Sequence, residues 1–243
     1  MLKRFALVAL LLANPANAQD EERDEAPTIM SGALRLDTTP RIADRAEEQA
    51  QDAVEETAPE FATTDVVLET AMGNIVIALE TERAPITTAN FLRYIDEDRL
   101  DGIVFYRAMT LDRGEQPNGL LQGGAQNDPE RILDPIPHEP TTVTGLSHTR
   151  GAISMAMGEP GSANADFSIM LGDQTGLDAN PDAEDPVWRN GYAVFGYVTE
   201  GMDVIEAIHA MPVDPEKGEG WMRGQMLAEP VVITDARRAE SAE

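Results

Sequence analysis

The fold class is decided by Val66-Val67-Leu68-Glu69 and Ile75-Val76-Ile77-Ala78-Leu79-Glu80, two apolar runs that flank Met72-Gly73-Asn74. A Gly-Asn pair between two apolar runs is typical of a hairpin, in which a tight turn joins two antiparallel strands. We therefore expect a β-hairpin at residues 66–80.

Downstream of this hairpin, the chain carries further short apolar segments bounded by turn residues. The segments predicted as strands are 103–108, 120–122, 152–157, 166–171, 193–198 and 231–233. One helix is expected to begin at Pro85 and to carry an apolar stripe of Phe91, Tyr94 and Ile95. A second is expected at 202–210, before Pro212. Many short strands and two helices predict a mainly β domain, a barrel or sandwich with helical caps.

The charge of the chain argues against one class of partner. Only 18 basic residues face 44 acidic ones among 243 residues, and the formal net charge is −26. Nucleic-acid binding needs clustered Lys and Arg, so we expect no nucleic-acid partner. We interpret the charge as favouring solubility and mutual repulsion.

Residues 1–18 have the pattern of a secretory signal peptide. Lys3 and Arg4 precede the apolar run 5–13, and Ala16-Asn17-Ala18 matches a cleavage site. We expect cleavage before Gln19 and export to the periplasm or beyond. No later stretch approaches the roughly 20 apolar residues of a membrane span, so we expect no membrane insertion after cleavage. The chain has 0 cysteines, which excludes disulfides and a lipid anchor on cysteine.

Residues 19–61 are acidic and contain few large apolar side chains. Such a composition cannot bury enough surface to offset the entropy lost on ordering. We therefore expect an acidic, disordered N-terminal linker at 19–61, a folded domain at 62–238 and a charged tail at 239–243.

A series of motifs within residues 64–236 resembles the cyclophilin family of peptidyl-prolyl cis-trans isomerases. In chain order these motifs are Gly73-Asn74-Ile75-Val76-Ile77-Ala78-Leu79, Ala84-Pro85-x-Thr87-x-x-Asn90-Phe91, Asp101-Gly102-Ile103-Val104-Phe105-Tyr106-Arg107, Gln122-Gly123-Gly124, Gly151-Ala152-Ile153-Ser154-Met155-Ala156, Gly161-Ser162-Ala163-Asn164, Phe167-x-Ile169, Leu177-Asp178, Ala193-Val194-Phe195-Gly196-Tyr197-Val198 and Gly201-Met202-Asp203-Val204-Ile205. One such motif would be a weak signal, whereas this many in the family's order are a specific one. The resemblance implies an eight-stranded antiparallel β-barrel capped by two α-helices, with a proline-binding groove on its outside.

The resemblance also implies an activity, the isomerisation of Xaa-Pro bonds in exported polypeptides. Resonance gives this bond a rotation barrier of about 18–20 kcal/mol, although its isomers differ by only about 0.5–1 kcal/mol. A fixed cation that favours the twisted amide lowers this barrier without a nucleophile, metal or cofactor. By resemblance that cation is Arg107, and Gln122 positions the substrate by hydrogen bonding. The implied protein is a monomer that binds proline-containing polypeptides.

Further positions around Arg107 are implied to bind the substrate. They are Phe105, Leu120, Leu121, Met155, Ala156, Met157, Asp166, Phe167, Ser168, Leu177 and Tyr192. Among them, Met155-Ala156-Met157 would pair with an extended substrate through its backbone.

Several groove positions depart from the family's pattern. Gly119 stands where a phenylalanine usually floors the proline pocket, Ser168 where an aromatic ring helps to hold the proline, and Gly176 where a bulky aromatic is common. Loops 109–118 and 179–190 are longer than usual and can refill the pocket or narrow its entrance. The departures leave open an alternative function, a catalytically weak or inactive cyclophilin-fold binding or chaperone module. A third possibility is an interaction protein in which the acidic arm binds the partner.

Other reactive side chains give no competing site. His138, His148 and His209 show no metal-ligand spacing, so we expect loop or core histidines and no metal. Ser154 does not lie in a nucleophile elbow, which argues against a hydrolase.

Overall fold

The computed structural model of this chain describes residues 61–240. The predicted signal peptide at 1–18 lies outside these residues, as do residues 19–60 of the predicted linker and residues 241–243 of the tail. Those three expectations stay predictions. No helix within the described part is both long enough and apolar enough to cross a membrane.

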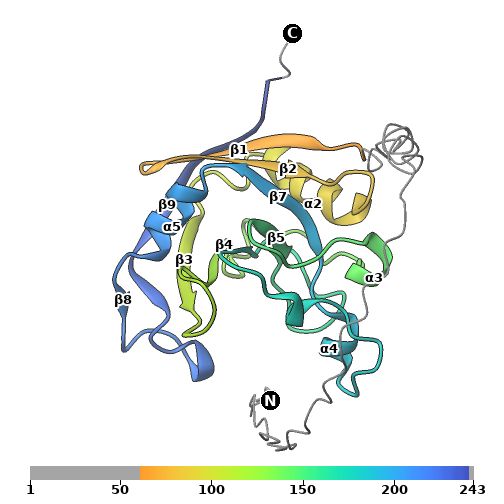
Figure 1. Ribbon diagram of the computed structural model, residues 1–243. Coiled ribbons are helices and arrows are strands. Elements are labelled where there is room, and N and C mark those ends of the chain that lie inside the picture. Colours follow the sequence, from red (N-terminus) through yellow and green to blue (C-terminus); the bar gives the residue numbers. More distant parts are fainter. Residues whose placement is uncertain (1–60, 241–243) are drawn as a thin grey trace, which may run out of the picture. The chain divides into compact units, whose positions relative to one another are not determined.

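Eight antiparallel strands close into a barrel (Figure 1), as the resemblance implied. In ring order they are β1 (Thr64–Thr70), β2 (Gly73–Leu79), β7 (Val194–Glu200), β5 (Ala152–Met155), β6 (Phe167–Met170), β4 (Gly119–Gly124), β3 (Val104–Thr110) and β9 (Met226–Arg238). The ring is closed by β1, which pairs with both β2 and β9. A short ninth strand, β8 (Val213–Asp214), pairs only with the start of β9.

The predicted hairpin forms between β1 and β2, but its turn lies two residues earlier than the Gly-Asn pair suggested. Thr70 pairs with Gly73, so Ala71 and Met72 make the turn and Asn74 already belongs to β2. The Thr70 hydroxyl donates to the Gly73 carbonyl at 2.9 Å and accepts from the Met72 N–H at 3.1 Å. This local bonding fixes the turn, because the side chain satisfies backbone groups that a tight turn leaves free.

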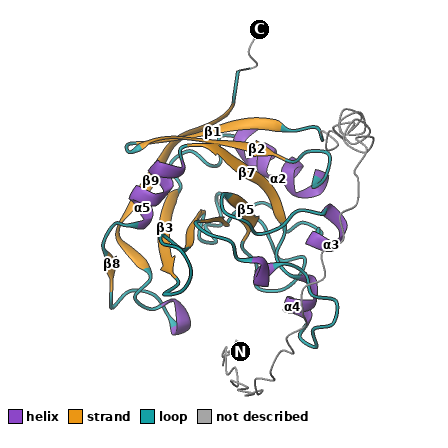
Figure 2. Ribbon diagram, in the orientation of Figure 1, coloured by secondary structure: helices purple, strands orange, loops and turns teal. Residues whose placement is uncertain are grey.

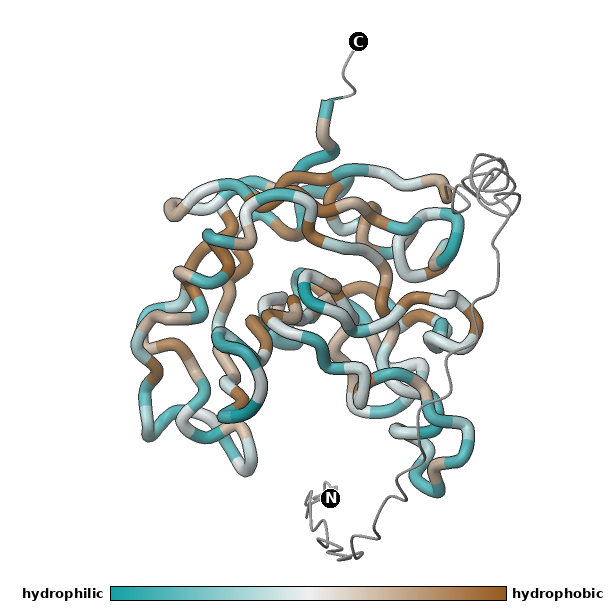
Figure 3. The backbone as a smooth tube through the Cα atoms, viewed as in Figure 1, coloured by the Kyte–Doolittle hydropathy of each residue, from teal (hydrophilic) through white to brown (hydrophobic). Residues whose placement is uncertain are grey.

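The interior of the barrel is a mostly aliphatic core with one aromatic cluster. Strand residues alternate between the interior and the outer face, and the inward positions of β1 and β2 are fully buried. The ring of Phe167 lies edge-on to those of Phe91 and Phe105, with centroids 5.5 Å and 6.0 Å apart, and Phe91 also packs on Phe195. Many of the hydrophobic residues fall on the strands (Figure 3).

Both predicted helices form. Helix α2 (Pro85–Asp96) packs against β7 and β9, and α5 (Met202–His209) packs against β2, β3 and β4. The structure adds single turns that the sequence patterns did not predict (Figure 2). They are α3 (Thr141–Thr144), α4 (Pro186–Asn190) and two 3-10 turns, Thr175–Leu177 and Gly220–Met222. Such short turns have no room for a periodic apolar pattern.

Helix α2 obtains its N-terminal cap from a distant residue. The residue before the helix, Ala84, provides no side-chain cap. Instead, the buried carboxylate of Glu139 accepts hydrogen bonds from the N–H groups of Ile86 and Thr87, at 3.1 Å and 2.7 Å, and from the Thr87 hydroxyl at 2.7 Å. A carboxylate at a helix N-terminus satisfies free donors and complements the helix dipole.

We expect Glu139→Ala to lower the free energy of unfolding by about 3 kcal/mol, because it leaves buried donors without a charged acceptor. Urea unfolding followed by circular dichroism measures this loss. Glu97→Ala is the control, since Glu97 pairs with Arg93 and Arg99 at the surface, and we expect it to cost under about 1 kcal/mol. Equal losses for the two variants would contradict the capping role.

Candidate active site

A β-bulge in β3 turns Arg107 toward the outer face of the barrel. Phe105 pairs with Gly123 and Arg107 pairs with Gln122, so Tyr106 is an extra residue with no partner on β4. Without a bulge, Arg107 would share the inward face of Phe105, which is fully buried in the core. The extra residue places Arg107 beside Gln122 on the outside.

Two glutamine side chains hold the Arg107 guanidinium. Its Nη1 donates to Gln122 Oε1 at 2.7 Å, and its Nε and Nη2 both donate to Gln225 Oε1, at 2.9 Å and 2.7 Å. The Trp221 ring stacks on the same guanidinium, with 4.4 Å from Cζ to the ring centroid. Together these contacts fix the orientation of the group and leave Arg107 only 4% exposed.

The positive charge of the Arg107 guanidinium is buried and poorly solvated. Burial lowers its pKa to about 10, and the nearby phenols of Tyr106 and Tyr192 oppose that shift. A group with this pKa stays protonated at physiological pH. The site therefore presents a fixed, poorly solvated cation, and a charge in such surroundings interacts strongly with a nearby dipole.

Gln122 belongs to a row of outward-facing residues that crosses four strands. Arg107 on β3 pairs with Gln122 on β4, Gln122 with Ser168 on β6, and Ser168 with Ser154 on β5. Side chains that stand opposite one another on neighbouring strands point to the same face. This row forms the floor of the site.

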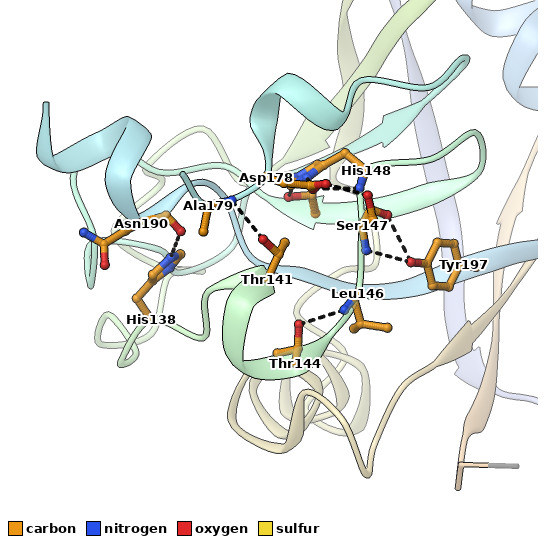
Figure 4. Close-up of polar contacts among 11 residues, drawn as sticks. His138, Thr141, Thr144, Leu146, Ser147, His148, Asp178, Ala179, Asn190 and Tyr197 are labelled. Atoms are coloured by element: carbon orange, nitrogen blue, oxygen red, sulfur yellow. Dashed lines mark hydrogen bonds and ion pairs between the residues drawn. The ribbon is translucent and has the colours of Figure 1, made fainter. Parts of the chain in front are cut away.

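The Ser154 end of the row is tied to a polar network. Its members Ser147, His148, Asp178 and Tyr197 are labelled in Figure 4. The Ser154 hydroxyl lies 2.9 Å from His148 Nε2, and His148 Nδ1 lies 2.5 Å from Asp178 Oδ1. Asp178 also accepts from the Ser147 hydroxyl, and the Tyr197 hydroxyl donates to the Ser147 carbonyl. Burial lowers the pKa of His148, and Asp178 opposes the shift.

Ser154, His148 and Asp178 follow the order of a hydrolytic triad, but the network is structural. His148 is 0% exposed and Ser154 is 2% exposed, so no substrate reaches the hydroxyl. His148 was predicted to be a loop or core histidine, and its burial places it in the core. Within residues 61–240, no group of three or more His, Cys, Asp or Glu side chains is arranged to hold a metal ion.

Part of the predicted substrate-binding set needs correction. The side chains of Phe105, Leu121, Phe167 and Met155 are buried in the core, because strand alternation turns these positions inward. They support the floor from beneath and cannot contact a substrate on the outer face. The Ala156 N–H is also unavailable for a substrate, since it donates to the Asp166 carbonyl at 2.8 Å.

The Asp166 carboxylate is also engaged within the protein. It accepts from the Tyr106 hydroxyl at 3.0 Å and from the Gln126 N–H at 2.9 Å. Burial raises the pKa of Asp166, and these hydrogen bonds act in the opposite direction. Asp166 thus joins the bulged Tyr106 to the loop after β4, and its carboxylate is not free to bind a substrate.

The other predicted contacts differ in exposure. Leu120 and Ser168 are buried, each 8% exposed, whereas Ala156, Met157, Leu177 and Tyr192 are half-buried. Tyr192 packs against Trp188, with ring centroids 6.4 Å apart. Burial raises the pKa of the Tyr192 phenol, and the positive charge of Arg107 opposes this rise.

Sequence reasoning missed two residues at the site, Trp221 and Gln225. Both come from the loop 215–225 between β8 and β9, where the sequence predicted no strand before residue 231. β9 in fact begins at Met226, and its register against β3 shifts between Val231 and Met226. This irregular stretch brings Gln225 beside Arg107, and the Ala108 N–H donates to the Gln225 carbonyl at 2.9 Å. The signal in the sequence that could have indicated this loop is Trp221, which follows the glycines of Gly218-Glu219-Gly220.

Comparisons with known proteins agree with this geometry. The model of the family described as cyclophilin type peptidyl-prolyl cis-trans isomerase/CLD matches residues 65–237. Peptidyl-prolyl cis-trans isomerase B of Escherichia coli is 31% identical over 180 residues, which cover 72% of this chain and 99% of that protein. A peptidyl-prolyl cis-trans isomerase of Streptomyces antibioticus is 34% identical over 177 residues, 71% of this chain and 96% of that protein.

Solved structures share the fold at lower sequence identity. A cyclophilin type peptidyl-prolyl cis-trans isomerase of Cryptosporidium parvum, solved in the presence of the dipeptide Ala-Pro, has a TM-score of 0.56 and 17% identity. The match covers 73% of this chain and 99% of that structure. The family model spans most of the described barrel, and the two bacterial relatives align over nearly their whole length. The chain therefore belongs to the cyclophilin-type peptidyl-prolyl cis-trans isomerase family.

Proposed function

We propose that this protein isomerises Xaa-Pro bonds in exported polypeptides and that Arg107 is the catalytic residue. The observation that carries this proposal is the arrangement around the guanidinium, a buried cation held by Gln122 and Gln225 above the outer face of the barrel. No proton has to leave the protein in this reaction, because the amide only rotates.

The guanidinium retains donors for a substrate. An arginine side chain has five N–H groups. Three hydrogen bonds join those of Arg107 to Gln122 and Gln225, and the other two N–H groups have no partner among residues 61–240. As the Xaa-Pro bond twists, its nitrogen pyramidalises and gains a lone pair. A fixed donor with a positive charge stabilises that lone pair more in the twisted form than in the planar one.

Gln122 is suited to align the substrate. Its side-chain oxygen is occupied by Arg107, whereas its Nε2 has no hydrogen-bond partner within the described residues. We propose that this amide donates to a carbonyl of an extended substrate. We also propose that Met157, Leu177 and Tyr192, which are half-buried, contact the substrate's side chains together with Leu120 and Ser168, which are each 8% exposed.

We further propose that the protein acts after export. Lys3 and Arg4, the apolar run 5–13 and the cleavage pattern at Ala18 support this location. Mass spectrometry of the protein from a periplasmic or culture-medium fraction would test it. A mature chain that begins at Gln19 is the expected result, and a chain retaining Met1 in the membrane fraction would reject it.

The alternative is a binding or chaperone module of low activity. Its support is the small size of Gly119 and Ser168 and the low exposure of Arg107. A protease-coupled assay on a short Ala-Pro-Phe peptide separates the two functions. We expect wild-type protein to speed the cis-to-trans step, which is otherwise slow at tens of seconds or longer. Binding of the peptide without acceleration would favour the alternative.

A further inference from the structure

We propose that Trp221 and Gln225, on the loop 215–225, form one wall of the substrate site: Trp221 is the aromatic surface on which the substrate's proline ring packs, and Gln225 is a positioning residue for Arg107. The inference rests on the proposed isomerase function and names a substrate contact that the family motifs in this sequence do not include. Its evidence is the set of contacts that joins this loop to the guanidinium.

Gln225 connects Trp221 to the Arg107 guanidinium. Its Oε1 accepts from both Nε and Nη2 of Arg107, at 2.9 Å and 2.7 Å, while its Nε2 donates to the Trp221 carbonyl at 2.8 Å. A side chain that binds two edges of a planar fork fixes its rotation as well as its position. Loss of Gln225 would therefore free the guanidinium to turn about its own axis while Gln122 still held one corner.

Trp221 places an accessible ring directly beside the charged group. One side of the indole covers the guanidinium, and yet the residue is 64% exposed. Arg107 itself is almost fully buried, and the ring lies directly against the guanidinium whose free N–H groups we assign to the substrate. An aromatic face favours contact with an apolar ring through the area it buries.

The other positions that the family resemblance assigns to the proline provide no free aromatic ring. Gly119 and Ser168 provide no ring at the two positions where an aromatic would hold the proline. Tyr192 is turned toward Trp188, with their centroids 6.4 Å apart. Trp221 is the aromatic ring that stacks on Arg107 within the described structure.

The loop is built in one conformation by its own hydrogen bonds. The N–H of Gly224 donates to the Lys217 carbonyl at 2.9 Å, and those of Met222 and Gln225 donate to Glu219 and Met222 at 3.1 Å each. Arg223 also pairs with Glu216. A wall that is ordered before binding lowers the entropy lost when the substrate is held.

The first test compares full-length wild type, Trp221→Ala, Trp221→Phe and Phe61→Ala in the coupled assay on the Ala-Pro-Phe peptide. Phe61 is the matched control, because its exposed ring also stacks on an arginine, 4.8 Å from Arg83 Cζ. We expect Trp221→Ala to raise KM by about tenfold with kcat changed much less, as when an aromatic contact to a ligand is truncated. Trp221→Phe should recover most of the affinity, and Phe61→Ala should match wild type.

The second test reads binding without catalysis. The chain has 2 tryptophans, so Trp188→Phe leaves Trp221 as the single reporter. Titration with the dipeptide Ala-Pro should change the emission of Trp221 with a saturable dependence on dipeptide concentration. The third test concerns the position of Arg107. Gln225→Ala should lower kcat several-fold with little change in KM. Gln225→Glu keeps the acceptor oxygen but loses the donor to the Trp221 carbonyl and adds a negative charge, so it should recover only part of kcat.

The outcomes separate this inference from the function on which it rests. An active wild type, an unchanged KM for Trp221→Ala and an unresponsive Trp221 emission would overturn the inference alone. A lower KM for Trp221→Ala would also overturn it, since the ring would then obstruct the site. A wild type that neither isomerises the peptide nor responds to the dipeptide would reject the proposed function, and with it this wall.

Discussion

Arg107→Ala is expected to lower kcat/KM on a short proline peptide by about 100-fold or more while the barrel stays folded. The twisted amide loses the positive charge of the guanidinium, and neither Gln122 nor Gln225 can replace it. The protease-coupled assay measures the loss, and far-ultraviolet circular dichroism checks the fold. Full activity in a folded Arg107→Ala protein would reject the mechanism.

Two comparisons make this result specific. Arg107→Lys keeps a positive charge but lacks the fork that bonds to both glutamines, so we expect it to recover only part of the activity. Arg150→Ala removes a surface guanidinium that pairs with Glu206, and it should leave kcat/KM unchanged. Because burial lowers the pKa of Arg107 only to about 10, wild-type activity should be flat from roughly pH 6 to pH 9.

Gly119→Ala is expected to lower the free energy of unfolding by about 4 kcal/mol or more. Gly119 has φ +134°, and a Cβ built there would lie 1.9 Å from the Met109 carbonyl oxygen. The start of β4 and the end of β3 would have to separate to admit it. Urea unfolding measures the change, and Gly119→Phe should be at least as destabilising.

The matched control for Gly119 is Gly145, which has φ +70° and no neighbouring atom within 4 Å of an added Cβ. Gly145→Ala should therefore cost only the conformational strain, about 1–2 kcal/mol. A Gly119→Ala protein as stable as Gly145→Ala would mean that the backbone at 109–119 adapts. The expected result explains why the family's phenylalanine cannot simply be restored here.

The barrel was predictable because its signals are local or periodic. Apolar runs, turn residues and the order of the motifs fixed the class of fold, and Pro85 marked the start of α2. The turn of the first hairpin was misplaced because a threonine side chain, rather than the Gly-Asn pair, organises it. The cap of α2 by Glu139 joins residues more than fifty positions apart, and no local pattern indicates such a contact.

The site was predictable only where a motif marked it. Arg107 and Gln122 lie together as expected, since adjacent strands carry them. The four side chains assigned to the substrate but found in the core were chosen by motif membership, which does not distinguish the two faces of a strand. Gln225 and Trp221 were missed because they approach Arg107 through an irregular part of β9.

The extra residue in β3 also decides which register the strand can adopt. A regular ladder that gave Tyr106 a position opposite β4 would turn Arg107 to the side of Phe105, in the apolar core. A guanidinium without a partner is costly to bury there, so the arginine itself disfavours this pairing. Deleting Tyr106 would instead leave Phe105 opposite Gly123 and the arginine opposite Gln122 on the outer face, and would remove the hydroxyl that donates to Asp166. The charge at the site therefore also selects the strand register as the barrel folds.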